Sequence, residues 1–144
     1  MKKFSTFIVE LKVDSPDAKD TLGISRDKMP QVKSADYDEL MTHLQKSGIK
    51  MQKKTVKANT LRATQRDFNT DKIVKAVGKI KTLGTAKPII VSSDNYVIDG
   101  HHRWLAAKNV GTSINIVQAN VKVKELMKSL YAFPKTFTKN INES

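Results

Sequence analysis

The sequence predicts an α/β (α+β) protein with one small domain, in which helices pack on a mixed sheet. Three observations support this prediction. The chain has 144 residues, which is enough for a single modest core. Helix-like and strand-like apolar patterns alternate along it, and a hairpin pattern leads directly into a helix pattern near residue 100.

Each element is predicted from the spacing of its apolar residues and from the residues at its ends. Ser34 or Asp36 can cap the first helix, and Gly48 and Gly84 can end the first two helices. A polar connection, residues 62–69, is expected between the first strand and the second helix. In order, the predicted elements are a helix over 34–48, a strand over 49–56, a helix over 70–84, a hairpin of strands 88–91 and 96–98, a helix over 103–108, a strand around 114–117 and a helix over 121–130.

Four segments are predicted along the chain. Residues 1–10 form a separate amino-terminal peptide, 11–33 a linker or arm, 34–133 the folded domain, and 134–144 a polar tail. No stretch approaches the eighteen or so apolar residues that a membrane span needs, so no membrane partner is expected.

The net charge of +12 is unevenly placed. Residues 1–38 are neutral overall, so the whole excess lies in residues 39–144. Such a balance favours polyanion partners, because neutralising phosphates releases condensed counterions. The alternative is a solvated basic surface with no partner. The chain has no cysteine, which excludes disulfides, zinc-thiolate sites and thiol catalysis.

The most distinctive run is Asp99-Gly100-His101-His102-Arg103. A strand that ends in Asp-Gly and continues at once as a helix presents backbone N–H groups to an anion, and glycine leaves them accessible. Arg103 adds a fork-shaped cation suited to phosphate oxygens. His101 and His102 can donate to phosphate or move a proton near neutral pH. Asp99 can accept a proton, hold a metal-bound water, or cap the helix and orient a histidine.

Structural roles compete with these chemical ones. An Asp-Gly pair by itself is usually a turn. Adjacent histidines at a helix start point in different directions, so one metal ion bound by both is disfavoured, and no metal ligand is assigned. Residues 104–107 are expected to pack in the core.

The run VIDGHHRWLAAKNVG resembles the signature helix of the ParB amino-terminal/sulfiredoxin superfamily, which has a Gly-x-x-Arg core followed by small residues. The segment LRATQRDF, residues 61–68, is similar to the other recurrent box of this superfamily, a strand that leads into a Gln-Arg turn. The resemblance covers about residues 49–130 and implies a ParB/sulfiredoxin-like domain.

The resemblance also implies a ligand and a set of site residues. The ligand would be the phosphate of DNA or of a nucleotide (ATP, ADP or CTP) with a divalent metal such as Mg. The Asp-Gly-His-His-Arg form is closer to free serine kinases and nuclease-like members, in which an acidic residue after the first box and the Asp of the turn serve proton transfer. The implied catalytic residues are Asp99, His101 and Asp67, and the implied phosphate ligands are Gly100, His101, His102, Arg103, Gln65 and Arg66.

Two departures from the superfamily narrow the expected activity. Sulfiredoxins carry a catalytic cysteine where this chain has His101, so sulfinic-acid reduction is excluded. The chromosome-partitioning members carry Gly-Glu-Arg-Arg and a following helix-turn-helix domain. This sequence has Gly-His-His-Arg and too few residues after the fold for such a domain, so partition-site binding is not expected.

The amino terminus has a resemblance of its own. MKKFSTFIVE is similar to the capsid-targeting peptides of T-even-type phage internal head proteins, which end at an Ile/Leu-x-Glu site cut by the prohead protease. This resemblance implies cleavage between Glu10 and Leu11, packaging with the capsid scaffold and the DNA, and delivery from the virion interior to the host cytoplasm. An ordinary amphipathic first helix or strand is the alternative.

Two classes of function therefore remain open. The first is an enzyme that acts at phosphate, either a nuclease or a nucleotide-dependent phosphotransferase, packaged in a phage head. The second is non-catalytic: a DNA-associated internal head protein, or an inhibitor of a host factor.

Overall fold

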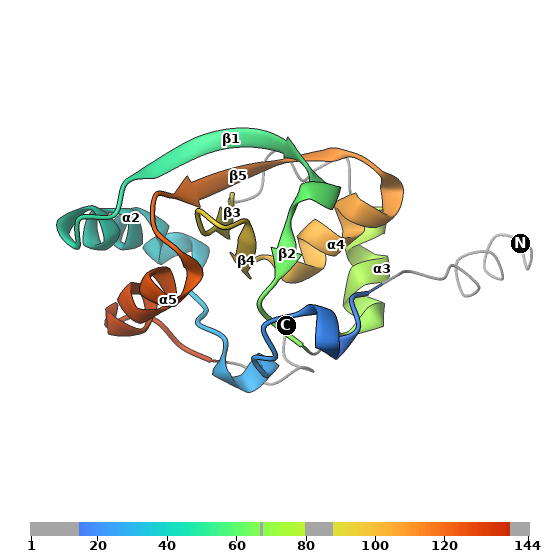
Figure 1. Cartoon of the computed structure of the whole chain (residues 1–144), viewed down its shortest axis with the longest axis horizontal. Coiled ribbons are helices and arrows are strands. Elements are labelled where there is room, and N and C mark those ends of the chain that lie inside the picture. The colour runs from blue at the N-terminus through green and yellow to red at the C-terminus, as the bar shows by residue number, and fades with distance from the viewer. Residues whose placement is uncertain (1–14, 67, 80–87, 139–144) are drawn as a thin grey trace, which may run out of the picture.

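The computed structural model describes residues 15–66, 68–79 and 88–138. Within these ranges five strands form one sheet in the order β1-β5-β3-β4-β2 (Figure 1). β1 pairs antiparallel with β5, and β3 pairs antiparallel with β4. The β3–β5 and β2–β4 pairs are parallel, so the predicted mixed sheet is confirmed. The strands are β1 Met51–Lys57, β2 Arg62–Ala63, β3 Ile89–Val91, β4 Tyr96–Asp99 and β5 Ser113–Ala119.

Helices cover both faces of the sheet. Figure 1 shows α2 and α5 together on one side, and α3 and α4 together on the other. Side chains alternate along the central strands, so Ile90 and Ile98 pack with α2 and α5, whereas Ile89, Val91 and Val97 pack with α3 and α4. The predicted arrangement of helices on a mixed sheet is therefore confirmed. The helices are α2 Tyr37–Lys46, α3 Thr70–Gly78, α4 His101–Val110 and α5 Val123–Ala132.

The β3–β4 hairpin and α4 form the local unit that the sequence predicts. The turn closes with a hydrogen bond from Asn95 N to Ser92 O at 3.0 Å. Asn95 has a φ of 68°, which asparagine tolerates better than most residues. β4 then continues through Gly100 into α4, and Gly111 ends that helix with a φ of 73°.

One strand lies where the polarity pattern predicts a connection. Arg62–Ala63 forms β2 at the edge of the sheet, as the resemblance of residues 61–68 implied. Ala63 is buried and pairs with Val97. Thr64 is also buried, and its hydroxyl donates to Val97 O at 2.7 Å. Polar side chains that bond inside the protein look like loop residues in sequence, so periodicity does not reveal this strand.

The described part of the predicted arm, residues 15–33, packs on the domain. Ile24 forms a parallel bridge with Gln65, so the arm continues the sheet beyond β2. Met29 is fully buried and lies in the core with α2 and α5. Folded structure therefore begins before Ser34, the residue at which the apolar pattern predicts its start. The pattern does not reveal this part of the fold, because the apolar residues of the arm follow no regular period.

The carboxy-terminal tail pairs with the arm. Gln31 and Phe137 exchange two backbone hydrogen bonds, of 2.8 and 2.9 Å. The predicted helix end at Gly84 and the amino-terminal peptide lie outside the described residues. In the described ranges, every helix is too short or too polar to cross a bilayer.

Candidate functional site

The candidate site lies where β4 becomes α4. β4 ends at Asp99, and Gly100 adopts left-handed backbone angles (φ 97°, ψ 27°) before α4 begins at His101. The carbonyl of Gly100 accepts the first helical bond, from Trp104 N at 3.0 Å. The first N–H groups of any α-helix lack an acceptor within that helix, and Gly100 has no side chain with which to cap them. The start of α4 therefore has the backbone geometry of an anion site.

Gly100 also makes room for Arg103. A Cβ atom added at Gly100 would lie 2.8 Å from Arg103 Nη2 and 2.9 Å from Ile89 Cγ1. The guanidinium group of Arg103 thus lies against Gly100, in the space that a side chain at residue 100 would take. Burial lowers the pKa of Arg103, and the charge of Asp99 opposes this shift. Asp99 is itself buried, at 7% exposure.

His101 points into the protein. Its side chain is 2% exposed, and its Nε2 atom accepts a hydrogen bond from Gln65 N at 3.3 Å. The Thr64 hydroxyl lies 3.2 Å from the same nitrogen. Burial, followed by the charges of His102 and Arg26, lowers the pKa of His101 to about 3. This placement favours a neutral ring that positions the Gln65 segment over one that touches a ligand.

His102 is half-buried and has a similar bond. Its Nε2 atom accepts from Asn69 N at 3.1 Å, one residue before α3. Burial is the main cause that lowers its pKa to about 4, and the charges of Arg26 and Lys72 add to the shift. Both histidines are therefore neutral at pH 7, and they connect the start of α4 to the segment between β2 and α3.

Arg26 is the main group at this site that sequence reasoning missed. Its side chain is only 9% exposed, and its Nη1 atom donates to Gln65 Oε1 at 3.2 Å. The charge of Arg26 acts on both His101 and His102. Arg26 is 39 residues from Gln65 in the chain, and only the folded arm brings the two together. The residues next to Arg26 in sequence therefore give no sign that it belongs to the site.

Tyr37 is a second residue near the site that the sequence analysis does not single out. Its hydroxyl is buried and has no hydrogen-bond partner in the part of the chain that the structure describes. Burial and then the charge of Asp99 raise the pKa of Tyr37 to about 12, and Arg103 acts in the opposite direction. Tyr37, at the start of α2, therefore faces the Asp99–Arg103 side of the site.

The structure brings most of the predicted residues together. His101 contacts the buried Gln65 through the Gln65 N–H, and Asp99, Gly100, His102 and Arg103 adjoin His101 in the same turn. Arg66 is exposed, and its backbone N–H donates to Ile24 O at 2.8 Å. Three predicted site residues, Asp67, Glu10 and Leu11, lie outside the described residues. Within the described ranges, no three His, Asp or Glu side chains gather as metal ligands would.

Comparison with known proteins identifies the family. The ParB N-terminal domain family matches residues 29–132, which include all four described α-helices and all five strands. No curated protein and no solved structure matches the chain. The match supports a DNA- or nucleotide-associated function at a general level. The chain belongs to the ParB N-terminal domain family.

Proposed function

We propose that the chain binds the phosphate groups of a nucleotide at the start of α4. One observation carries this proposal. Arg103 lies against Gly100 at the N-terminus of α4, and the N-cap residue there is a glycine, which has no side chain to cap the helix. Backbone N–H groups and a guanidinium there match the oxygens of a phosphate. Arg26 and Lys72 add positive charge close by, since both depress the pKa of His102.

The residues of the site have three distinct roles. The backbone of residues 100–103 and the Arg103 side chain bind phosphate, whereas His101 holds the Gln65 segment in place. Asp99, at the end of β4, is the group that accepts a proton from an attacking hydroxyl or water. A Mg ion bound to the phosphate oxygens, with water as its other ligands, would neutralise charge there. Asp67 stays a second candidate base.

Nucleotide binding is tested by titration of ATP, ADP and CTP, each with Mg, monitored by calorimetry. Arg103→Ala is expected to weaken binding by about tenfold or more, because charge-assisted hydrogen bonds contribute roughly 1.5–3 kcal/mol. Arg62→Ala is the matched control, since Arg62 is exposed and stacks on Tyr96 at the far end of β4. Equal affinity in wild type and Arg103→Ala would overturn the proposal.

Turnover separates an enzyme from a binding protein. Asp99→Asn is expected to keep nucleotide affinity within a few-fold and to abolish phosphate transfer or DNA cleavage. If the wild-type chain binds nucleotide but turns over neither nucleotide nor DNA with any divalent metal, the non-catalytic alternative replaces the enzyme.

We also infer a packaging role from the first ten residues, independently of the site. The Ile8-Val9-Glu10 pattern behind a Met-Lys start supports removal of this peptide during head assembly. Mass spectrometry of purified phage particles is expected to find a chain that begins at Leu11. A chain that still begins at Met1, or absence from the particles, would exclude the role.

A further inference from the structure

We propose that β1 and the adjoining side of β5 form a docking surface for the backbone of double-stranded DNA, separate from the start of α4. This β1 surface comprises residues 50–57 with Asn115, Gln118 and Asn120. β1 is an edge strand of the sheet, and five of its seven residues are exposed. Exposed lysines occur at four positions of the surface: Lys50, Lys53, Lys54 and Lys57.

The charge of this surface is one-sided. Residues 46–63 contain six Lys or Arg and no Asp or Glu. Residues 100–124, which include β5, contain four Lys or Arg and again no Asp or Glu. No carboxylate in the described ranges pairs with the four lysines, in contrast to Lys135, which pairs with Asp36 and Glu39. Within the described ranges no ion pair neutralises these four lysines, so their charge suits a polyanion.

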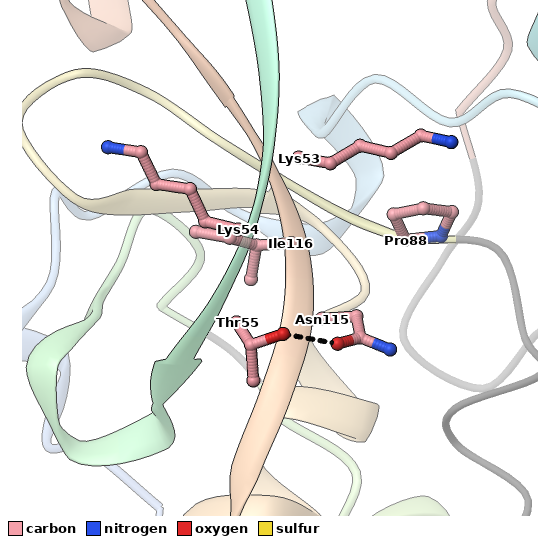
Figure 2. A pocket seen from close by; sticks show the side chains of 6 residues that line it. All are labelled: Lys53, Lys54, Thr55, Pro88, Asn115 and Ile116. Carbon is pink, nitrogen blue, oxygen red and sulfur yellow. Dashed lines mark hydrogen bonds between the residues drawn. The ribbon is translucent and has the colours of Figure 1, made fainter.

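The lysines lie on both faces of the strand. Figure 2 shows the side chains of Lys53 and Lys54 extending to opposite sides of β1, as strand alternation requires. A shallow pocket of about 360 Å³ is lined by both lysines together with Thr55, Pro88, Asn115 and Ile116 (Figure 2). A second pocket, of about 510 Å³, adjoins Lys50 and Asn120. The surface is thus hollowed at two places beside its lysines.

Uncharged polar groups lie between the lysines of the β1 surface. Thr55 Oγ1 donates to Asn115 Oδ1 at 2.8 Å (Figure 2), and Lys54 Nζ donates to Gln118 Oε1 at 2.8 Å. Lysine, hydroxyl and amide side chains are the groups that contact phosphates and sugars in protein–DNA complexes. They position a duplex without reading its sequence.

Two observations favour duplex DNA over a single strand and over a purely protective role of the lysines. β1 and β5 contain no Phe, Tyr or Trp, whereas surfaces that bind single strands stack bases on aromatic rings. Lysines on an edge strand also prevent pairing with another sheet. Protection against such pairing needs charge on the edge strand alone. It does not explain why β5 and its flanking segments, residues 100–124, also lack acidic residues.

The test compares two variants of equal net charge by fluorescence anisotropy with a duplex of mixed sequence. Lys50→Gln/Lys53→Gln/Lys54→Gln/Lys57→Gln removes the lysines of the β1 surface. Its matched control, Lys28→Gln/Lys33→Gln/Lys75→Gln/Lys128→Gln, removes four exposed lysines elsewhere. The β1 variant is expected to lose affinity about tenfold or more, and its slope of log affinity against log salt to fall by about 2–4, because each lost phosphate contact removes nearly one counterion. The control variant is expected to change much less.

Three outcomes would overturn the proposal. These are equal losses in the two variants, no duplex binding by the wild type, and binding of single strands or RNA in preference to duplex DNA. Should the fourfold variant unfold, Lys53→Gln/Lys57→Gln replaces it, because it leaves the Lys54–Gln118 bond in place. Arg103→Ala is expected to keep duplex affinity within about twofold. A loss there as large as in the β1 variant would place the DNA at the start of α4 and refute the β1 surface, whatever the outcome of nucleotide titration.

Discussion

Gly100 has two separate reasons to be glycine, and substitution can separate them. Gly100→Ala places a Cβ in the left-handed region and against Arg103 and Ile89, so we expect destabilisation of about 1–3 kcal/mol and weaker nucleotide binding. Gly48→Ala is the matched control, because Gly48 also has a positive φ, of 83°, but open space around it. Urea unfolding and nucleotide titration measure both effects. Unchanged nucleotide affinity in Gly100→Ala would contradict the close packing of Arg103 on this residue.

The two neutral histidines make the stability of the protein depend on pH. Their folded pKa values, about 3 for His101 and about 4 for His102, lie below the ordinary value of 6.5. The unfolded chain therefore binds more protons as the pH falls below 6.5, and stability decreases by up to roughly 1.4 kcal/mol per pH unit for each histidine. This loss levels off once the pH is below the folded pKa values.

His102→Gln is expected to reduce that slope between about pH 6 and pH 5, a window above the range in which most carboxylates titrate. A glutamine oxygen can still accept the hydrogen bond from Asn69 N. Urea midpoints at each pH measure the slope in the two proteins. Identical slopes would mean that the pKa of His102 in the folded state is close to its ordinary value, which would contradict this account.

At the scale of elements, the arm completes the site. Arg26 lies three residues before the family match begins, yet its guanidinium reaches Gln65 and acts on both histidines. The bridge between Ile24 and Gln65 and the burial of Met29 hold the arm in place. The arm therefore adds a cation to a site that the domain builds from α4 and the β2–α3 segment.

Arg26→Gln is expected to raise the pKa of His102 from about 4 toward 6.5, because removing a nearby cation makes protonation easier. The rise is expected to be partial, since burial is the larger cause and remains. Histidine ring signals followed by NMR across the pH range measure the shift. Lys75→Gln, on the exposed side of α3, is the control and is expected to leave that pKa unchanged.

At the scale of the whole molecule, the net charge of +12 opposes folding through self-repulsion. Raising monovalent salt from about 0.02 M to about 0.2 M is therefore expected to raise the urea midpoint, because it shortens the screening length. The same change is expected to weaken duplex binding steeply, so stability and DNA affinity respond to salt in opposite directions. The fourfold β1 variant should gain less stability from salt than the wild type. A midpoint that falls with salt would contradict this account.

Apart from β2, the order of the helices and strands follows from the sequence alone, and so does the turn at the start of α4. Short-range chemistry decides them: apolar spacing selects strand or helix, Asn95 accepts a positive φ, and Gly100 and Gly111 bound α4. The run from Asp99 to Arg103 is contiguous, so its backbone forms one turn wherever the strand continues directly into the helix. The zero net charge of the first 38 residues and the positive net charge of the rest are likewise properties of the sequence.

Only the tertiary structure decided which other residues meet that turn and how its histidines behave. Arg26, Tyr37 and Lys72 come from the arm, α2 and α3, and no local pattern places them beside α4. The sequence allowed His101 and His102 to be proton donors, but burial and neighbouring cations hold both neutral. Backbone preference acts between near neighbours in the chain, whereas desolvation and charge depend on residues that folding brings together from far apart.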